Sequence, residues 1–575
     1  MDNQRLFTWG LFGLMFFMSW QAWQLDYHTP APQQQAPAEA AAVVPGAAPG
    51  ATTPTEFSGE GVPSLSAPLA VETAPAETSA TPGKTARPSG IPVSIKTDVL
   101  DLTINTKGAD IVSATTLKYP VAKDRPDDLV TLFGSDTTDY GRFKTGLILQ
   151  PDQPANPDHF ALYTTPIDSY QLKDGEDSMT VSFLWEGANG ISVEKQYTFT
   201  RGSYQVDLNF IVRNASEQAL RAVNYVVIAK TAKLPDRSMV DVETYSFSGP
   251  VLFDGDKYEK YDIDDLQDDG STSFDAENGW IAAIQHHFLV AAIPPADQDW
   301  KYTVGIDKVE RSLFKVEALG EQDAPAVASN QQVSIPMTLF VGPKLQSQLE
   351  EISPKLKLTV DYGFLTLLAQ PLFWLLDKVH DLVKNWGFSI IIVTILIKLA
   401  FYRLTASSGR SMAKMRSLQP RMKKIQERYK EDRQALSREM MELYKKEKVN
   451  PAAGCLPILI QMPFFLAFYW VLLESVEMRQ APFMLWINDL SSRDPYFVLP
   501  LLMGVAMFFQ QKLNPAPADP IQAKVMSVLP VVFTVFFAFF PAGLVLYWLS
   551  NTLLSIAQQW RINKMVLAEE AAKAR

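Results

Sequence analysis

The stretch VMSVLPVVFTVFFAFFPAGLVLYWLSN, residues 525–551, decides the fold. It contains no charged residue, and with its flanks it is long enough for two helices that each cross a hydrocarbon core of about 30 Å. The tripeptide Pro541-Ala542-Gly543 is a turn signal. We therefore expect two membrane spans, over residues 523–540 and 541–560, and a protein of the α-helical membrane class.

Further apolar segments extend this pattern toward the N-terminus. Residues 387–404, 455–475 and 495–511 each suit a span, which makes 387–560 a five-span core. Residues 6–25, LFTWGLFGLMFFMSWQAWQL, suit a sixth. A cleavable signal peptide is the alternative there, but no small-x-small cleavage site follows, so we interpret residues 1–28 as a retained anchor.

The distribution of positive charge predicts the orientation of these spans. The loop 403–448 holds fourteen Lys and Arg residues against six Asp and Glu, whereas the loop 479–494 holds only Arg479 and Arg493. Basic loops stay in the cytoplasm. Both termini, including a tail at 561–575, are therefore expected in the cytoplasm, and the residues between the anchor and the core outside it.

The region between the anchor and the core divides into three parts. Residues 29–90 are rich in Pro, Ala and Thr and predict a disordered tether. From 91 to 345 the apolar period is two, as in Tyr204, Val206, Leu208, Phe210 and Val212, which indicates a large extracytoplasmic antiparallel β-sandwich. Residues 346–386 return to helical spacing with interrupting charges, which favours an amphipathic helix on the membrane surface.

The basic loop is itself expected to fold as a helical hairpin over residues 405–449. Its apolar residues recur every three or four positions on either side of Asp432-Arg433. Its exposed cations, such as Lys423, Lys424 and Arg428, have two equally weighted interpretations. They are solvated helix faces, or they contact anionic lipid headgroups or ribosomal RNA.

No residue pattern indicates catalysis or a bound cofactor. The single cysteine, Cys455, excludes an intramolecular disulfide and a Cys-rich zinc site. No HExxH, GxSxG or dinucleotide-binding glycine pattern occurs, and the adjacent His286 and His287 are not spaced as a helical metal pair. We therefore expect no enzymatic activity, no metal and no cofactor.

Polar residues inside the predicted spans are the functional signal. Lys398 lies in the first core span with Thr394 one turn before it, and Gln461 lies in the next span. The last span carries Ser550, Asn551, Thr552, Ser555, Gln558 and Gln559. A lysine at this depth either snorkels to the headgroups or faces a shared polar cavity, and the accompanying polar residues favour the cavity.

Several motifs carry a family resemblance. VNPAAGCLP (449–457), IQMPFF (460–465), SMAKMRSLQP (411–420), QAPFMLWINDLSSRDPY (480–496) and FPAGLVLYWLSN (540–551) resemble the signature of the YidC membrane-protein insertases in their Gram-negative bacterial form. The resemblance covers essentially the whole chain. It implies an inner-membrane insertase and chaperone, working alone or with the Sec translocon on nascent inner-membrane proteins, whose β domain is a periplasmic supersandwich.

The resemblance also implies a hydrophilic groove open to the cytoplasm and to lipid. Lys398, Thr394, Gln461 and Trp548 match groove positions of the family, although many relatives have Arg and Tyr in place of Lys398 and Trp548. Phe465, Ser550 and Asn551 complete the predicted groove. The ribosome and anionic lipids are further expected partners, and DNA is not. The alternative function, a transporter or channel, would require repeated halves, and the sequence shows none.

Overall fold

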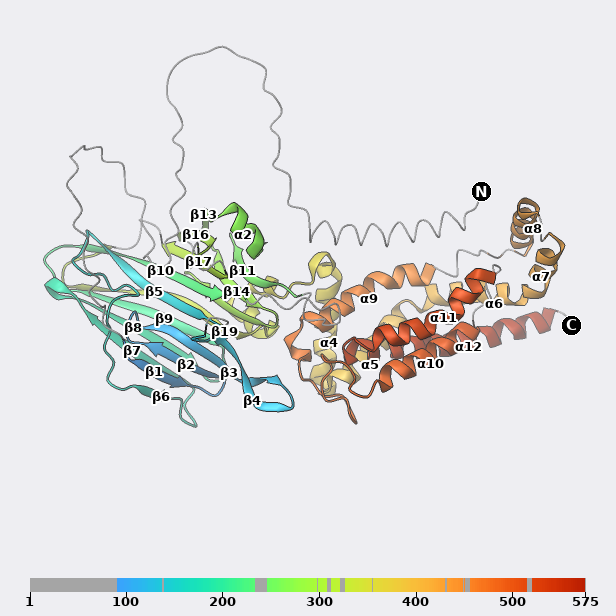
Figure 1. Cartoon of the computed structure of the whole chain (residues 1–575), viewed down its shortest axis with the longest axis horizontal. Coiled ribbons are helices and arrows are strands. Elements are labelled where there is room, and N and C mark those ends of the chain that lie inside the picture. Colours follow the sequence, from blue (N-terminus) through green and yellow to red (C-terminus); the bar gives the residue numbers. More distant parts are fainter. Residues whose placement is uncertain are drawn as a thin grey trace, which may run out of the picture.

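A computed structural model of the chain describes residues 90–573, apart from 137–138, 233–245, 297, 308–311, 321–325, 354, 430–431, 448, 450–455 and 514–519. The predicted anchor, nearly all of the predicted tether, and Cys455 lie outside the described residues. The described chain has two parts placed end to end, a β-sandwich and a bundle of long helices (Figure 1).

The predicted β-sandwich is confirmed, and its two sheets are almost entirely antiparallel. The first has eleven strands, in the order β13 (Thr272–Glu277), β16 (Asp299–Ile306), β17 (Leu313–Gly320), β10 (Leu220–Thr231), β5 (Gly141–Gln150), β3 (Asp110–Ala122), β2 (Leu100–Asn105), β1 (Pro92–Lys96) and β6 (Ser169–Gln171), with β18 (Ala326–Val327) beside β10 and β4 (Arg125–Phe133) beside β3. The second has eight, in the order β12 (Tyr258–Lys260), β11 (Ser248–Phe253), β14 (Trp280–Gln285), β15 (Phe288–Ile293), β19 (Gln331–Pro343), β9 (Gln205–Asn214), β8 (Ile191–Thr200) and β7 (Ser178–Glu186). A short helix α2 (Ile263–Asp269) and a 3-10 turn η1 (Ala188–Gly190) lie in the connections.

The alternation in the sequence explains how the sheets pack. In β9 the side chains of Val206, Leu208, Phe210 and Val212 are fully buried, whereas the residues between them reach the other face. Successive residues of a strand point to opposite faces of the sheet, so one face of β9 enters the core between the sheets. Burying four such side chains contributes roughly 1.5–3 kcal/mol each.

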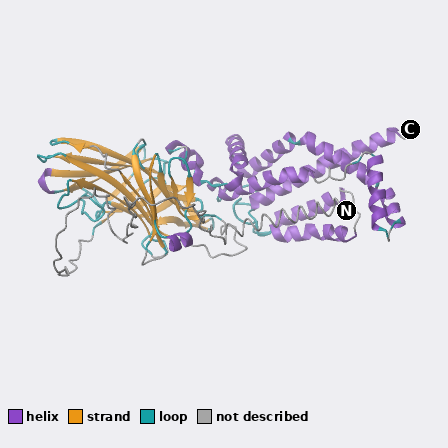
Figure 2. Ribbon diagram, turned by 90° about the horizontal axis from the view of Figure 1, so that it is seen from above, coloured by secondary structure: helices purple, strands orange, loops and turns teal. Residues whose placement is uncertain are grey.

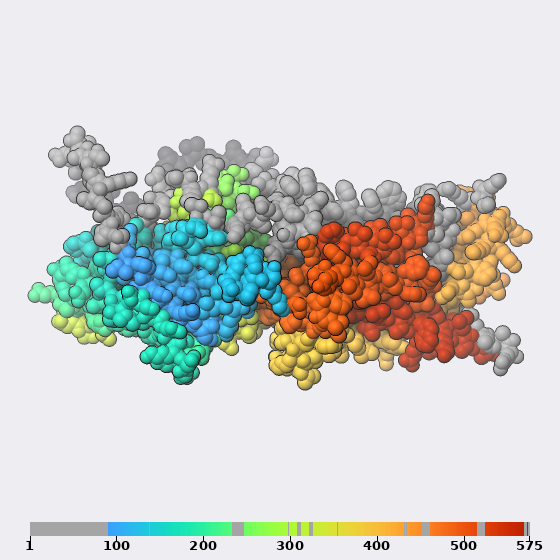
Figure 3. Space-filling view, turned by 60° about the horizontal axis from the view of Figure 1, so that its bottom comes forward, coloured from blue at the N-terminus to red at the C-terminus, as the bar shows by residue number. Residues whose placement is uncertain are grey.

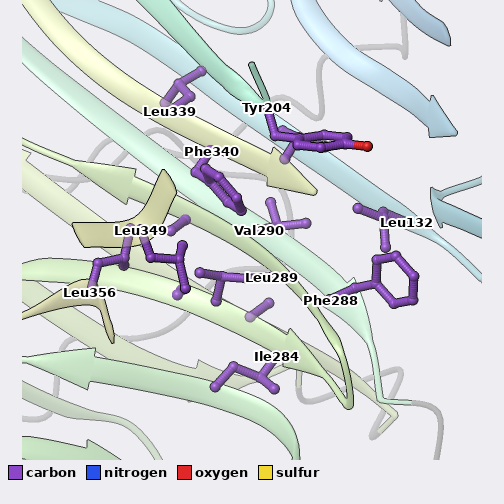
Figure 4. Close-up of a cluster of buried hydrophobic side chains, with 14 of the residues drawn as sticks. Leu132, Tyr204, Ile284, Phe288, Leu289, Val290, Leu339, Phe340, Leu349 and Leu356 are labelled. Atoms are coloured by element: carbon purple, nitrogen blue, oxygen red, sulfur yellow. The ribbon is translucent and has the colours of Figure 1, made fainter. Parts of the chain in front are cut away.

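The region 346–386 is not one helix, which corrects the prediction. It consists of α3 (Gln346–Ile352), two 3-10 turns, η3 (Leu356–Thr359) and η4 (Gly363–Leu365), and α4 (Thr366–Val383). Gly363 has φ +58°, a conformation that interrupts a helix and favours glycine. Leu349 of α3 and Leu356 of η3 pack beside Leu289 and Phe340 of the second sheet (Figure 4).

Only α4 has the amphipathic character expected for the membrane surface. It buries Leu372 and Leu376 against the bundle and leaves Leu367 and Leu382, both 85% exposed, together with Trp374 on its outer face. Large apolar side chains left exposed in this way mark a contact surface.

The bundle contains the helices expected from the apolar segments. They are α5 (Trp386–Ala400), α9 (Leu456–Glu474), α10 (Val498–Leu513), α11 (Pro520–Phe537) and α12 (Ala542–Lys573), with a 3-10 turn η6 (Val476–Met478) after α9. Between α5 and α9 lie α6 (Tyr402–Ser417), α7 (Gln419–Arg428) and α8 (Arg433–Lys446). The chain is helical to Lys573, so the predicted tail continues α12.

Measured by length and apolarity, no single helix of the described residues qualifies as a membrane span. Helices α5 and α6 qualify together, across a bend of 71°. The apolar segments Gln461–Glu474, Val498–Leu513 and Lys524–Phe537 are shorter. The structure thus establishes a β-sandwich followed by a helical region, and the six spans remain a prediction.

The expected division of the last apolar region lies between α11 and α12. The backbone N–H groups of Ala542 and Gly543 donate to the carbonyl oxygens of Ser492 and Leu490, at 2.7 and 2.9 Å. A Cβ atom on Gly543 would lie 3.1 Å from the Leu490 oxygen, so a side chain would crowd this contact. The loop between α9 and α10 therefore holds the turn in place.

Buried polar groups join the β-sandwich to the bundle, where the two surfaces meet in Figure 3. Lys344, at the end of β19, pairs with Glu474 of α9 at 3.4 Å, and the Ser246 hydroxyl donates to the same carboxylate at 2.8 Å. The ring of His287 lies 2.9 Å from the Leu473 carbonyl oxygen. Because a buried charge is costly without its partner, these pairs favour one arrangement of the two parts.

Burial also shifts the acid–base equilibria of this junction. It raises the pKa of Glu477 to about 7 and lowers the pKa of His286 to about 4. One oxygen of Glu477, Oε1, accepts a hydrogen bond from the Gln346 backbone, while Oε2 is shielded from solvent and has no hydrogen-bond partner among the described residues. Both groups are therefore held in their neutral forms at pH values near 6.

We predict that Glu477→Gln removes a stability loss that sets in as the pH rises. The folded state holds the Glu477 proton up to about pH 7, whereas an unfolded glutamate loses it near 4.5. The stability of wild type relative to the variant should therefore fall as the pH rises from about 4.5 through about 7. His286 acts in the opposite direction in both proteins and cancels in the comparison.

Melting of the full chain in detergent from pH 5 to pH 8.5 measures this effect. The Tm of the variant should gain on that of wild type by about 5–10 °C, because the difference between a folded pKa of about 7 and an unfolded pKa of 4.5 corresponds to about 2–3 kcal/mol over this pH range. Glu351→Gln, at an exposed carboxylate of α3, is the control for loss of one carboxyl group. If the Tm values of Glu477→Gln and wild type change with pH in parallel, the raised pKa of Glu477 is contradicted.

Candidate functional site

A polar network inside the bundle surrounds Lys398. Its ammonium group donates to the Ser555 hydroxyl at 2.8 Å and to Oε1 of Gln461 at 3.4 Å. The Gln461 amide donates in turn to Oδ1 of Asn551. Three helices, α5, α9 and α12, therefore bring four polar side chains to one point.

The spacing along α12 orients this network. Asn551 and Ser555 are four residues apart and so lie on the same face of the helix. The Ser555 hydroxyl donates to the Asn551 carbonyl oxygen at 2.7 Å, which leaves its lone pairs directed at Lys398. The Ser555 hydroxyl, held by the backbone of the preceding turn of α12, is thus oriented to accept a hydrogen bond from the Lys398 ammonium group.

Only neutral groups hold the Lys398 ammonium among the described residues. No carboxylate there lies within ion-pairing distance of it, and no Asp or Glu occurs in the sequence between Asp381 and Glu427. Two neutral acceptors do not replace the hydration shell of an ammonium group, and its third proton has no partner among them. The site is therefore suited to water or to an approaching anion.

A small cavity adjoins the ammonium group. Lys398, Gln461 and Thr405 give it a polar side, and the rest of its wall is apolar, formed by Ile397, Phe401, Leu404 and Phe464. Polar contacts continue from there along α12, because the Gln558 amide donates to the Thr405 hydroxyl at 2.7 Å. A polar path thus runs from Lys398 toward α6.

The other predicted groove residues lie around this network and do not all join it. Thr394 is buried, and its hydroxyl donates to the Ile390 carbonyl oxygen of its own helix at 2.6 Å. Ser550 is also buried and makes no contact with Lys398 within the part of the chain that the structure describes. The shared face of Thr394 and Lys398 predicted by their spacing therefore does not bring the two groups together.

Phe465 and Trp548 form an aromatic wall at one side of the network. Their ring centroids are 4.5 Å apart with the planes at 83°, and Trp548 lies 5.3 Å from the ring of Phe537 of α11. Edge-to-face pairs of this kind stabilise by about 0.5–1.5 kcal/mol beyond their buried area. The wall links α9, α11 and α12.

Ser555 and Gln558 belong to the polar residues of the last predicted span, and the structure shows that Ser555 contacts Lys398 directly and Gln558 contacts Thr405, a residue that was not predicted. The signal for Ser555 was its spacing of four from Asn551, and Thr405 follows Lys398 by seven residues, two turns along the chain. Helical spacing could not predict the position of Thr405 relative to Lys398, because the helix bends by 71° between α5 and α6.

The predicted hairpin over residues 405–449 is shorter in the structure, where it consists of α7 and α8. Residues 405–417 belong to α6, which packs against α12 through Ala413 and Ile562. Leu418, Met422 and Val449 are buried between the helices of the hairpin, and Arg421 pairs with Glu447 at 2.6 Å. Lys423, Lys424 and Arg428 lie on the exposed side of α7 and have no carboxylate partner among the described residues. In the described ranges no group of three or more His, Cys, Asp or Glu side chains is arranged to hold a metal ion.

Both parts of the chain match known protein families. Residues 378–569 match the model of the 60Kd inner membrane protein family, and residues 92–375 match that of the YidC periplasmic domain. The chain is 50% identical over 484 residues to the membrane protein insertase YidC of Alkalilimnicola ehrlichii, covering 84% of each chain. It is 44% identical to that of Nitrosococcus oceani over 576 residues, covering 99% of this chain and 100% of the relative.

Among solved structures, a crystal structure of an active YidC insertase aligns with 82% of this chain and 94% of its own. The identity is 18% and the TM-score is 0.37. The two family models together account for the β-sandwich and the helical bundle, and the curated relatives match over nearly the full length. The chain therefore belongs to the YidC family of membrane protein insertases.

Proposed function

We propose that this chain inserts and folds inner-membrane proteins by offering the polar network around Lys398 to the segment being inserted. The observation that carries the proposal is the ammonium group of Lys398, which lies inside the bundle beside a cavity and contacts only neutral acceptors among the described residues. Such a group binds an incoming carboxylate more readily than one already paired within the protein.

The topology proposed with it has six spans, five of them in the core. The described core helices carry large exposed apolar side chains on their outer faces, such as Leu399, Leu501, Phe509, Val531 and Val535. The β-sandwich and the basic hairpin lie at opposite ends of the bundle (Figure 2). The hairpin then lies in the cytoplasm and the β domain in the periplasm, as the positive-inside rule requires.

The physical task fits this arrangement. Each unsatisfied polar group of a translocated tail costs several kcal/mol in hydrocarbon. Polar side chains on α5, α9 and α12, together with water in the cavity, offer such groups partners and shorten the dry part of the path. The exposed apolar faces of the same helices receive the hydrophobic part of the substrate.

The partners proposed for the chain follow from these surfaces. Nascent inner-membrane proteins occupy the groove, and the exposed cations Lys423, Lys424 and Arg428 contact the ribosome or anionic lipids. The Sec translocon, which the sequence resemblance implies, is a further proposed partner.

We predict that only the charge of Lys398 matters for insertion. Lys398→Arg should retain activity, whereas Lys398→Ala should lower the insertion yield of a substrate with an acidic tail by roughly two- to tenfold, because one charge pair through water contributes ~0.5–1.4 kcal/mol. The measurement compares two substrates that differ only in the acidity of the tail, in proteoliposomes of wild type and variant.

Lys524→Ala is the control, because it removes an exposed lysine from α11. Equal loss for acidic and neutral tails in Lys398→Ala, or no loss for either, would show that Lys398 serves packing or anchoring and not substrate attraction.

We also predict that the hairpin binds its partner through charge. Changing Lys423, Lys424 and Arg428 to Glu should weaken binding of the chain to ribosomes or to anionic vesicles, and the loss should be largest at low salt, because exposed charges are screened within about 10 Å at 0.1 M ionic strength. Sedimentation at increasing salt concentrations measures it. Identical binding curves for variant and wild type would support the interpretation as solvated helix faces.

A further inference from the structure

The geometry of α6 points to a second polar site, outside the groove. An open hollow of about 450 Å³ is lined by Tyr402, Arg403, Ala406, Ser407, Arg410, Ser411 and Lys414, all on one side of the helix. The opposite side of α6 faces α12, where Thr405 and Gly409 contact Gln558 and Gln559. The hollow is therefore separate from the groove.

Three cations surround this hollow without an acidic partner. Arg403, Arg410 and Lys414 are exposed and form no ion pair with any carboxylate of the described residues. The sequence has no acidic residue from 382 to 426, whereas the hairpin that follows mixes Glu with its cations and pairs Arg421 with Glu447. Three converging cations with no counter-ion form a site for a phosphate or another strong anion.

An exposed apolar strip runs along α5 to the bend that precedes this hollow. Phe388, Ile395, Leu396 and Leu399 are 36–62% exposed and share one face of α5, and Tyr402 follows at the start of α6. From residue 388 to 399 the helix rises about 16 Å, which is comparable to an acyl chain. Lys398 lies on a different face and contacts α9 and α12.

We propose that the hollow on α6 binds the headgroup of an anionic phospholipid whose acyl chains lie along the strip on α5. The proposal rests on the membrane topology proposed above, which puts the bend between α5 and α6 at the cytoplasmic headgroups. A soluble polyanion such as RNA would leave the apolar strip uncovered. A zwitterionic lipid would bring an ammonium group to three cations, so the lipid carries net negative charge.

The test is lipid binding to the purified full chain in detergent, measured by native mass spectrometry. Phosphatidylglycerol and phosphatidylcholine with the same acyl chains are titrated separately. Wild type should bind phosphatidylglycerol more tightly than phosphatidylcholine. A variant with Arg403→Gln, Arg410→Gln and Lys414→Gln should bind it on the order of 10- to 100-fold more weakly, as expected for loss of three cations near a lipid surface.

A matched control loses the same charge elsewhere in the cytoplasmic region. Arg438, Lys445 and Lys446 are exposed on α8, and their replacement by Gln should leave lipid binding unchanged. An additional variant, Arg403→Lys with Arg410→Lys, keeps the charge and should bind within a few-fold of wild type. Equal loss in the control, or unchanged binding in the first variant, would overturn the site.

Two further arms identify the ligand. Inorganic phosphate and the deacylated headgroup should not displace the lipid at comparable concentrations, and Leu396→Asn with Leu399→Asn should weaken lipid binding. Displacement by free phosphate with no effect of the leucine changes would overturn the lipid assignment in favour of a soluble anion. No substrate is present in this titration, so its outcome is independent of whether Lys398 acts in insertion.

Discussion

An ammonium group inside a helical bundle is the constraint on which the rest of this structure depends. Lys398 lies between α5, α9 and α12 and contacts only Ser555 and Gln461 among the described residues. Two neutral acceptors do not fully replace the hydration of its ammonium group, so we propose that water or a substrate anion reaches this residue. The cavity beside Lys398 provides that access, and the polar face of α12 extends it toward α6. In the proposed function, this incompletely satisfied ammonium group is the point at which a polar tail binds.

At the junction with the β-sandwich, several buried polar groups of the bundle have partners within the protein. There the polar groups are paired, with Lys344 on Glu474, Ser246 on the same carboxylate and His287 on the backbone of α9. Arg479 adds a hydrogen bond to the Pro120 carbonyl oxygen of the β-sandwich at 2.8 Å. Lys344, Glu474, Ser246 and His287 are thus satisfied without water, whereas Oε2 of Glu477 in the same junction has no hydrogen-bond partner among the described residues.

Local patterns predicted the elements better than they predicted how the elements meet. The period of two in β9 and the turn at Pro541-Ala542-Gly543 specify structure within a few residues, and both predictions agree with the structure. The region 346–386 failed as a single helix because α3 already ends before Ser353, whose backbone is extended and which precedes a proline in the sequence, and because Gly363 adopts a positive φ farther on. The spacing of apolar residues alone reveals neither break. Thr394 shares a helical face with Lys398 in sequence, yet its hydroxyl is satisfied by its own backbone. Contacts between helices far apart in the sequence, such as that of Lys398 in α5 with Ser555 in α12 over 157 positions, depend on packing that no local pattern encodes.

The bend between α5 and α6 connects the two polar sites and explains why they do not interfere. Over 71° the chain turns from an apolar helix to a basic one, so residues close in sequence point to different environments. Thr405 and Gly409 face α12 and continue the groove, whereas Arg403, Arg410 and Lys414 face away from it. A headgroup bound on the outer side would neutralise three cations that otherwise compete with Lys398 for the acidic residues of a substrate. If both proposals hold, the separation of the two faces by one helix leaves Lys398 as the cation that a substrate meets in the groove, although the surrounding segment is strongly basic.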